Sequence, residues 1–232
     1  MKIDAGNKSI GFIGAGVMGA ALIKSLISSS INATQIYVNE KSDDRAKQVK
    51  DQYKINLVSI EEIGKSCDVI FLAVKPQDLS SALAELSHTL SSDALLISIA
   101  AGKTTKYIES QLKTGNSVIR VMPNTPALVG EGAAAISGSS QCVEADMAWA
   151  ESVLGSVGTV VRVDEKLLDA VTAISGSGPA YIFLIAEALM SSAVGAGLTP
   201  EISNTLVRQL LVGSAKLLQQ STETPAQLRA QV

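Results

Sequence analysis

A glycine-rich motif near the start of the chain constrains the fold more than any other feature of the sequence. The apolar run at residues 9–13 is followed directly by Gly14, Gly16 and Gly19 in the spacing G-x-G-x-x-G, and apolar residues then recur at helical intervals as far as Ile27. The order predicts a strand, a tight turn and a helix. In that context the motif holds the pyrophosphate of a dinucleotide against a helix N-terminus. A plain glycine-rich turn without a ligand is the alternative.

Four more apolar runs predict further strands, and amphipathic segments between them predict helices. They lie at residues 36–38, 67–74, 94–99 and 117–121. Strands that alternate with helices form parallel βαβ units. Because 47% of the 232 residues are hydrophobic and 18% are charged, the chain can bury a sizeable core. We therefore expect an α/β protein whose N-terminal domain is a Rossmann-type, doubly wound parallel sheet.

After Val163 the sequence changes character. Residues 165–173, 179–195 and 200–220 are rich in Ala and Leu at helical spacing, and no strand is predicted there. We expect a dinucleotide-binding domain at residues 1–164 and a smaller all-helical domain at residues 165–232. A helical segment this short and apolar cannot bury its own faces well. Partner subunits are the expected cover, in a homodimer or a larger homo-oligomer.

The composition excludes several other classes of function. A net charge of −3 with 3% aromatic residues does not suit a nucleic-acid surface. Two cysteines and one histidine at no ligand spacing favour neither a metal site nor a disulfide framework. The first nine residues lack the apolar core of a secretory signal, and no segment is expected to span a membrane. The expected location is cytoplasmic.

The residues after the second predicted strand bear on which dinucleotide is bound. An NAD-type protein presents a carboxylate to the ribose hydroxyls at that point. Asn39 occupies the expected position of the acid, and Lys41 and Ser42 offer a charge and a hydroxyl to a 2′-phosphate. This favours NADP, with NADH as the alternative. Glu40 would repel the phosphate if its side chain turned inward, and would have no role as a surface residue.

Three further segments follow predicted strands, where an open α/β sheet binds its ligands. They are residues 73–76, 100–102 and 122–126, and their small residues and prolines suit a ligand that passes close to the backbone. Asn124 offers an amide to the ligand, or caps a turn. Ordinary loops are the alternative for all three segments.

The segment Ser-Gly-Ser-Gly-Pro at residues 175–179 precedes a long predicted helix. Pro179 suits the first helical turn, which would leave backbone N–H groups and the hydroxyls of Ser175 and Ser177 available to an anion such as a carboxylate. A linker between domains with a serine cap is the alternative.

Five motifs in one order resemble the pyrroline-5-carboxylate reductase family, and together they cover nearly the whole chain. They are FIGAGVMG at residues 12–19, FLAVKP at 71–76, SIAAG at 98–102, RVMPNTP at 120–126 and DAVTAISGSGPAY at 169–181. The resemblance implies reduction of the cyclic imine 1-pyrroline-5-carboxylate to L-proline by NAD(P)H, the last step of proline biosynthesis. It also implies an N-terminal dinucleotide domain and a C-terminal helical domain that dimerises.

The resemblance also implies roles for individual residues. The residues expected to bind the cofactor are Ile13, Gly14, Ala15, Gly16, Val17, Met18, Asn39, Lys41, Ser42, Ala73, Val74, Lys75, Pro76, Ala100, Ala101 and Gly102. The residues expected to bind the substrate are Asn124, Ser175, Gly176, Ser177 and Gly178. The proton donor to the imine is not assigned, and Ser175, Ser177 and Thr172 are the candidates. The family's substrate loop would begin where this sequence ends, so we expect the helical domain to be incomplete at its C-terminus.

Two other functions stay open at this stage. A hydroxyacid-type dehydrogenase would share the first domain but needs a catalytic Lys or His in the second, for which Lys166 is the nearby candidate. A non-catalytic NADP(H) sensor would need the glycine motif alone. Arg120 is expected to pair within the sheet rather than bind substrate.

Overall fold

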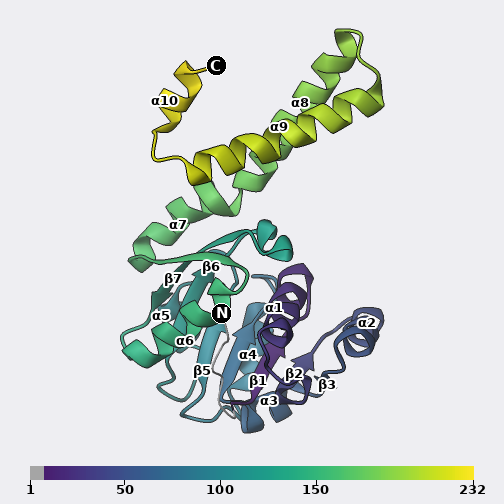
Figure 1. Ribbon diagram of the computed structural model, residues 1–232. Coiled ribbons are helices and arrows are strands. Elements are labelled where there is room, and N and C mark those ends of the chain that lie inside the picture. Colours follow the sequence, from purple (N-terminus) through teal and green to yellow (C-terminus); the bar gives the residue numbers. More distant parts are fainter. Residues whose placement is uncertain (1–7) are drawn as a thin grey trace. The chain divides into compact units, whose positions relative to one another are not determined.

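The computed structural model describes residues 8–232 and divides into two compact units, Met1–Ser177 and Gly178–Val232. Both units are drawn in Figure 1, and each is described here by itself. The first unit contains the whole sheet, and the second is entirely helical.

The sheet of the first unit has eight strands in the order β3-β2-β1-β4-β5-β6-β7-β8. Neighbouring strands are parallel except β6 and β7, which are antiparallel. Its strands are β1 (Ile10–Ile13), β2 (Ile36–Asn39), β3 (Asn56–Leu57), β4 (Val69–Leu72), β5 (Leu95–Ser98), β6 (Val118–Met122), β7 (Gly132–Gly138) and β8 (Gly158–Arg162). The predicted Rossmann-type architecture is confirmed.

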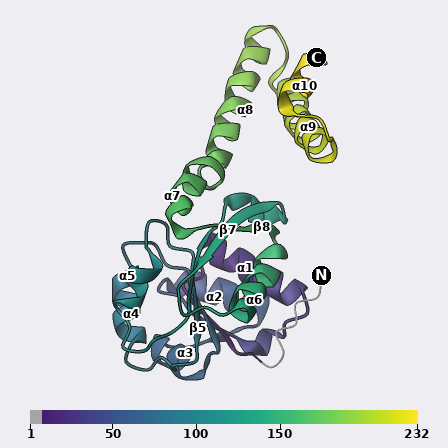
Figure 2. The same ribbon diagram turned by 90° about the vertical axis from the view of Figure 1, so that its left-hand side faces the viewer.

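Helices cover both faces of this sheet. Figure 2 shows α3, α4 and α5 on one side and α1 and α6 on the other. The helices of the first unit are α1 (Val17–Ser28), α2 (Asp43–Tyr53), α3 (Ile60–Ser66), α4 (Leu79–Leu86), α5 (Thr105–Glu109), α6 (Glu144–Gly155) and α7 (Leu168–Val171). Two buried apolar clusters fill the two spaces between helices and sheet.

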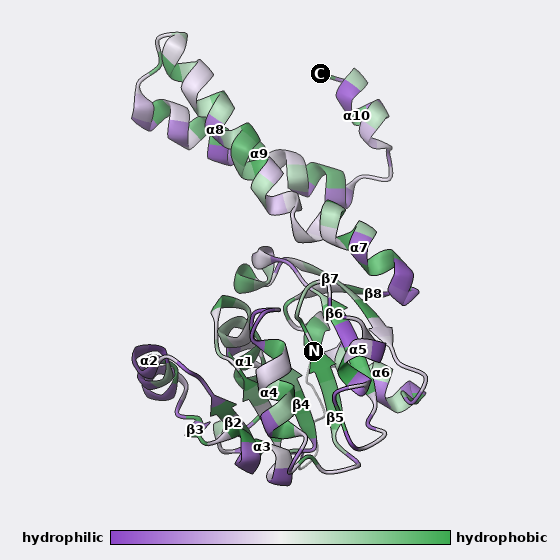
Figure 3. Ribbon diagram, turned by 180° about the vertical axis from the view of Figure 1, so that it is seen from behind, coloured by the Kyte–Doolittle hydropathy of each residue, from purple (hydrophilic) through white to green (hydrophobic). Residues whose placement is uncertain are grey.

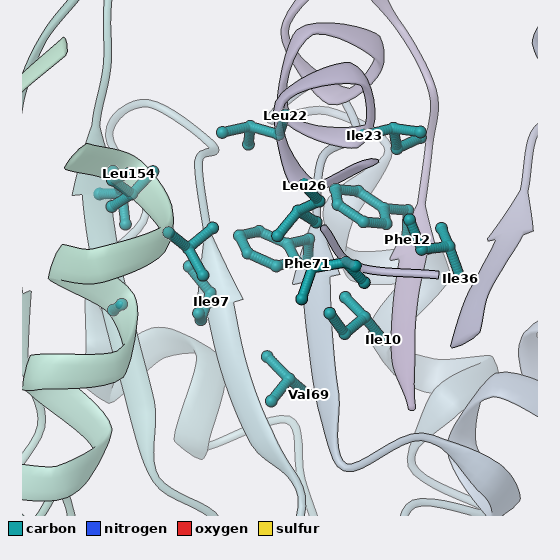
Figure 4. Packing of buried hydrophobic residues seen from close by; sticks show 14 of the residues in the cluster. Ile10, Phe12, Leu22, Ile23, Leu26, Ile36, Val69, Phe71, Ile97 and Leu154 are labelled. Atoms are coloured by element: carbon teal, nitrogen blue, oxygen red, sulfur yellow. The ribbon is translucent and has the colours of Figure 1, made fainter. Parts of the chain in front are cut away.

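The core explains why the apolar runs form strands. All four residues of β1, β4 and β5 are buried, as expected of central strands covered on both faces. Phe12 and Phe71 stack with ring centroids 4.6 Å apart, and Figure 4 shows them among the aliphatic side chains under α1. Burial of each such ring stabilises the fold by roughly 1.5–3 kcal/mol.

Three strands were not predicted from the sequence. β3 is two residues long, and β7 has the sequence GAAAISG, whose Gly and Ala have low strand propensity. β8 is mostly exposed and therefore lacks a continuous apolar run. β7 forms because its backbone pairs on both sides, antiparallel to β6 and parallel to β8. Tertiary pairing here outweighs local propensity.

The second unit contains α8 (Gly178–Gly195), α9 (Pro200–Gln220) and α10 (Pro225–Ala230). α9 begins as predicted, with Pro200 in its first turn and the Thr199 hydroxyl accepting from the Ile202 N–H at 3.3 Å. α8 and α9 pack against each other, and the Ser203 hydroxyl donates to the Met190 carbonyl across them at 2.9 Å.

The helices of the second unit bury very little. Within it, Ser203 and Val207 are the two residues classed as buried, and Phe183 and Leu184 are 66% and 65% exposed. Figure 3 shows hydrophobic residues along α8 and α9. By length and composition alone, one described helical run, Glu165–Gly195, could cross a membrane, with a mean hydropathy of 1.3 over an 18-residue window. The absence of a membrane-spanning segment stays a prediction.

Candidate functional site

The glycine motif forms a tight turn between β1 and α1. Gly14 has φ +94°, and its N–H donates to the Asn39 carbonyl at 2.7 Å. A Cβ on Gly14 would lie 2.7 Å from the Ala73 carbonyl oxygen, and a Cβ on Gly19 would lie 2.8 Å from the Gly14 carbonyl oxygen. Glycine is therefore required at both positions by close backbone approach, and at Gly14 by its positive φ as well.

Gly16 differs from the other two glycines because the space beside it is open. A Cβ there would meet no atom within 4 Å, so the protein's own packing does not explain this glycine. Gly16 is the N-cap of α1, without a side-chain cap and without an acidic residue in the first turn. The first N–H groups of an α-helix have no partner within the helix and carry the positive end of its dipole, so this helix start fits the pyrophosphate of a dinucleotide.

The loops after β4 and β5 lie at the same edge of the sheet as the glycine turn, because both strands run parallel to β1. The Ala73 N–H donates to the Ile13 carbonyl at 2.9 Å, which ties the loop after β4 to the turn. Lys75 and Ala101 are exposed, and Gly102 has φ +70° with no atom near its missing Cβ. The loops after β4 and β5 therefore expose mainly backbone and small side chains at the sheet edge where the glycine turn lies.

The residues after β2 do not present a ready phosphate site. The Asn39 amide donates to the Val58 carbonyl at 3.0 Å. The Ser42 hydroxyl caps α2, and Lys41 is exposed. Glu40 is turned inward, and its Oε2 accepts from the Ala15 N–H at 2.7 Å. Of the two orientations that the sequence allowed for Glu40, the structure has the inward one.

The side-chain amide of Asn124 joins two other segments of the chain through hydrogen bonds. Its Oδ1 accepts from the Ala133 N–H at 2.8 Å, and its Nδ2 donates to the Ser175 carbonyl at 3.1 Å. In an α-helix the Ser175 carbonyl would accept from residue 179, but Pro179 has no N–H. Asn124 therefore satisfies a carbonyl that the proline leaves without its helical partner.

The segment before Pro179 is not the open helix start that the sequence suggested. Residues Thr172–Gly176 form a π-helical turn within the helical run Glu165–Gly195, and the Ser177 N–H donates to the Thr172 carbonyl at 2.8 Å. The hydroxyls of Thr172 and Ser175 donate to backbone carbonyls four residues earlier, at 2.8 and 3.2 Å. A π-turn inside a helix is a frequent feature of functional sites.

Arg120 lies buried at 4% exposure, but its partners lie outside the sheet, in the helical segment after β8, so the predicted pairing within the sheet is wrong. Its guanidinium is 3.1 Å from Asp169 Oδ1 and 3.7 Å from Glu165 Oε1. Glu165 also accepts from the N–H and hydroxyl of Thr105, at 2.7 and 2.9 Å. This cluster, missed by the sequence analysis, anchors the start of the helical run to the sheet.

The remaining reactive side chains do not gather into a second site. Among residues 8–232, no group of three or more His, Cys, Asp or Glu side chains is placed to hold a metal ion. Burial raises the pKa of the Cys67 thiol to about 12, so that thiol stays protonated near neutral pH. Lys166 is exposed and pairs with Asp164 at 3.3 Å.

A glycine turn at a helix N-terminus, in a Rossmann-type sheet, defines a dinucleotide-binding protein. Two family models agree with that class. Residues 9–102 match "NADP oxidoreductase coenzyme F420-dependent", and residues 165–232 match "Pyrroline-5-carboxylate reductase dimerisation".

Individual relatives cover both regions. The chain is 39% identical to pyrroline-5-carboxylate reductase of Methanosarcina acetivorans and 35% identical to that of Escherichia coli, in each case over 97% of this chain and 84% of the relative. The solved reductase of Coxiella burnetii superposes with a TM-score of 0.89 at 33% identity, covering 97% of this chain and 84% of that one. The Plasmodium falciparum enzyme, solved with NADP bound, gives 0.87 at 34% identity with the same coverages.

The chain belongs to the pyrroline-5-carboxylate reductase family. The resemblance drawn from the five motifs is thereby confirmed. The oxidoreductase class and NADP as the cofactor of the family are confirmed as well. The family comparison favours neither a hydroxyacid-type dehydrogenase nor a sensor that binds without turnover.

Proposed function

We propose that this chain reduces 1-pyrroline-5-carboxylate to L-proline with a reduced nicotinamide dinucleotide. The observation that carries the proposal is the open space beside Gly16 at the N-terminus of α1, in a chain of this family. When bound, the dihydronicotinamide supplies the hydride that reduces the C=N bond. The chain's own residues bind and orient the two reactants.

The cofactor-binding residues are proposed from the family motifs and the edge of the sheet where they lie. They are Ile13, Gly14, Ala15, Gly16, Val17, Met18, Asn39, Lys41, Ser42, Ala73, Val74, Lys75, Pro76, Ala100, Ala101 and Gly102. The unfilled helix end at Gly16 supports a pyrophosphate contact. The exposed positions Lys75, Ala101 and Gly102 support a cofactor that lies along the loops after β4 and β5.

The substrate-binding residues are proposed to be Asn124, Ser175, Gly176, Ser177 and Gly178. Asn124 acts here as a positioning residue, because its amide bonds hold Ser175 and Ala133 in place. Thr172, Ser175 and Ser177 stay the candidate proton donors to the imine. The first two would each give up a hydroxyl bond to a backbone carbonyl in order to donate, so Ser177 is the first to test.

We propose that the chain works as a cytoplasmic homo-oligomer through its C-terminal helices. The match of residues 165–232 to a dimerisation family supports the homo-oligomer. The exposed apolar side chains of α8 and α9 support those helices as the contact surface. The match to the dimerisation family begins at residue 165, which supports residue 165 as the functional start of the helical domain. The compact units divide later, after Ser177.

One assay tests the reaction. Oxidation of NADPH and of NADH is followed with 1-pyrroline-5-carboxylate and, separately, with a panel of keto acids, using the full-length protein. We expect oxidation with the imine together with stoichiometric L-proline. Oxidation with keto acids alone would indicate a hydroxyacid-type dehydrogenase, and tight cofactor binding without any turnover would indicate a sensor. Either result would overturn the proposal.

A further inference from the structure

Glu40 is held in a fixed position beside the glycine turn. Its Oε2 accepts from the Ala15 N–H at 2.7 Å and its Oε1 accepts from the Ser42 N–H at 3.0 Å. Each carboxylate oxygen therefore has a backbone donor, one from the turn after β1 and one from the turn before α2. Such charge-assisted bonds fix the position of a carboxylate.

The strand register places this carboxylate where the adenosine ribose of a dinucleotide lies. Ile13 of β1 pairs with Asn39 of β2, so Glu40 stands level with Gly14 at the end of β2. In Rossmann-type proteins an acidic residue at the end of the second strand accepts hydrogen bonds from the ribose hydroxyls. Two oxygens that already accept one bond each retain lone pairs for such hydroxyls.

The same carboxylate is unfavourable for a 2′-phosphate, which carries close to two negative charges. Asp43 and Asp44 in the first turn of α2 add negative charge at this corner. Lys41 and Arg45 are the nearby cations, and both are exposed, so their attraction is screened by solvent and salt. The half-buried Glu40 is fixed at the ribose position and is screened less.

We propose that Glu40 sets the cofactor preference of this chain. It accepts the ribose hydroxyls of NADH and repels the 2′-phosphate of NADPH, so that both dinucleotides bind but NADH binds more tightly. The inference rests on the cofactor half of the proposed function and is independent of the substrate. The chain still binds NADPH, as the family comparison supports, but with lower affinity than NADH.

Binding of NADH and NADPH is measured directly by calorimetric or fluorescence titration, without substrate. We expect the wild-type protein to bind NADH about tenfold more tightly than NADPH, a difference of about 1.4 kcal/mol. Glu40→Gln keeps the side-chain size and removes the charge. This variant should shift the ratio toward NADPH by at least tenfold. Glu85→Gln, on the exposed face of α4, removes the same charge away from the glycine turn and should leave the ratio unchanged.

Wild-type affinity that is equal for the two dinucleotides or higher for NADPH would overturn the inference, and this comparison does not depend on the folding of any variant. An unchanged ratio in a folded Glu40→Gln protein would also overturn it. Added salt should narrow the wild-type difference, because the repulsion is electrostatic. Failure of the proposed reaction would look different, since both dinucleotides would still bind while 1-pyrroline-5-carboxylate stayed unreduced.

Discussion

The two units of the chain use their apolar residues in opposite ways. In the first unit, the central strands β1, β4 and β5 are fully buried beneath helices on both faces. In the second unit, α8 has no buried residue, although its apolar content is high, and α9 buries two. One unit therefore contains its own core, whereas the other presents apolar surface.

The difference shows which functions each unit can perform alone. The glycine turn, Glu40 and the loops after β4 and β5 all belong to the first unit and are fixed by contacts within it. The helices of the second unit gain stability only if another surface covers them, since exposed apolar side chains contribute little to the fold. Cofactor binding should therefore need only one chain, whereas the stability of the helical unit should depend on the assembly.

A matched pair of phenylalanine truncations gives the largest contrast. Phe71→Ala removes a fully buried ring stacked on Phe12 and should lower the free energy of unfolding by about 3–5 kcal/mol. Phe183→Ala removes a ring that is 66% exposed within one chain. It should leave the stability of the dilute, dissociated chain within about 0.5 kcal/mol of wild type. Denaturant unfolding at several protein concentrations measures both, and equal losses would contradict the contrast between the units.

A charge on α8 tests whether the apolar helix surface joins subunits. Phe183→Glu should weaken the homo-oligomer by about 2–3 kcal/mol per interface, because each copy would bury an unpaired carboxylate. Sedimentation velocity should show smaller species at micromolar concentration. Val143→Glu, at a 60% exposed valine of the first unit, should not change the assembly. Unchanged sedimentation of Phe183→Glu would show that α8 lies outside the interface.

Two glycines of the same turn should separate folding from binding. Gly14→Ala forces a Cβ into the Ala73 carbonyl at a positive φ and should cost about 1–3 kcal/mol of stability. Gly16→Ala meets no protein atom and should change the stability by less than about 1 kcal/mol while weakening cofactor binding. Thermal unfolding and dinucleotide titration of both variants check this. Unaltered affinity in Gly16→Ala would contradict the pyrophosphate site.

The smallest expected effect concerns the exposed Arg162 cluster of the first unit. Hydrogen bonds from Arg162 lower the pKa of Glu144 and of Glu151. A carboxyl pKa that is lower in the folded state than in the unfolded state stabilises the protein at pH values above the unfolded-state pKa of about 4.3. This stabilisation is lost as the pH falls through the folded-state pKa. Arg162→Ala should therefore melt slightly below wild type at neutral pH and level with it in acid. A difference that persisted in acid would argue against the ion pairs as the cause.

The sequence predicts the features that local pattern determines. Buried apolar runs identified the central strands, and the G-x-G-x-x-G spacing identified a turn that close backbone contact requires at Gly14 and Gly19. β7 escaped prediction because its pairing with β6 and β8, rather than its Gly and Ala residues, makes it a strand.

The finer features of the site depend on contacts between distant residues. The Arg120 cluster joins residues 49 and 60 positions apart, so no local pattern reveals it. The orientation of Glu40 depends on an N–H donor 25 residues away, and the sequence left both orientations open. One signal was available: Pro179 inside a helical run leaves a carbonyl without its helical donor, which predicts a side chain such as Asn124 beside Ser175.

We expect the first unit to bind the cofactor without help from the helical assembly. The most direct measurement is a titration of NADH into the Phe183→Glu protein under conditions where sedimentation shows it dissociated. We expect a dissociation constant within about twofold of the wild-type value, because the hydrogen bonds that fix Gly14, Ala15 and Ala73 are made within the first unit. A loss of affinity of tenfold or more in the folded variant would contradict it.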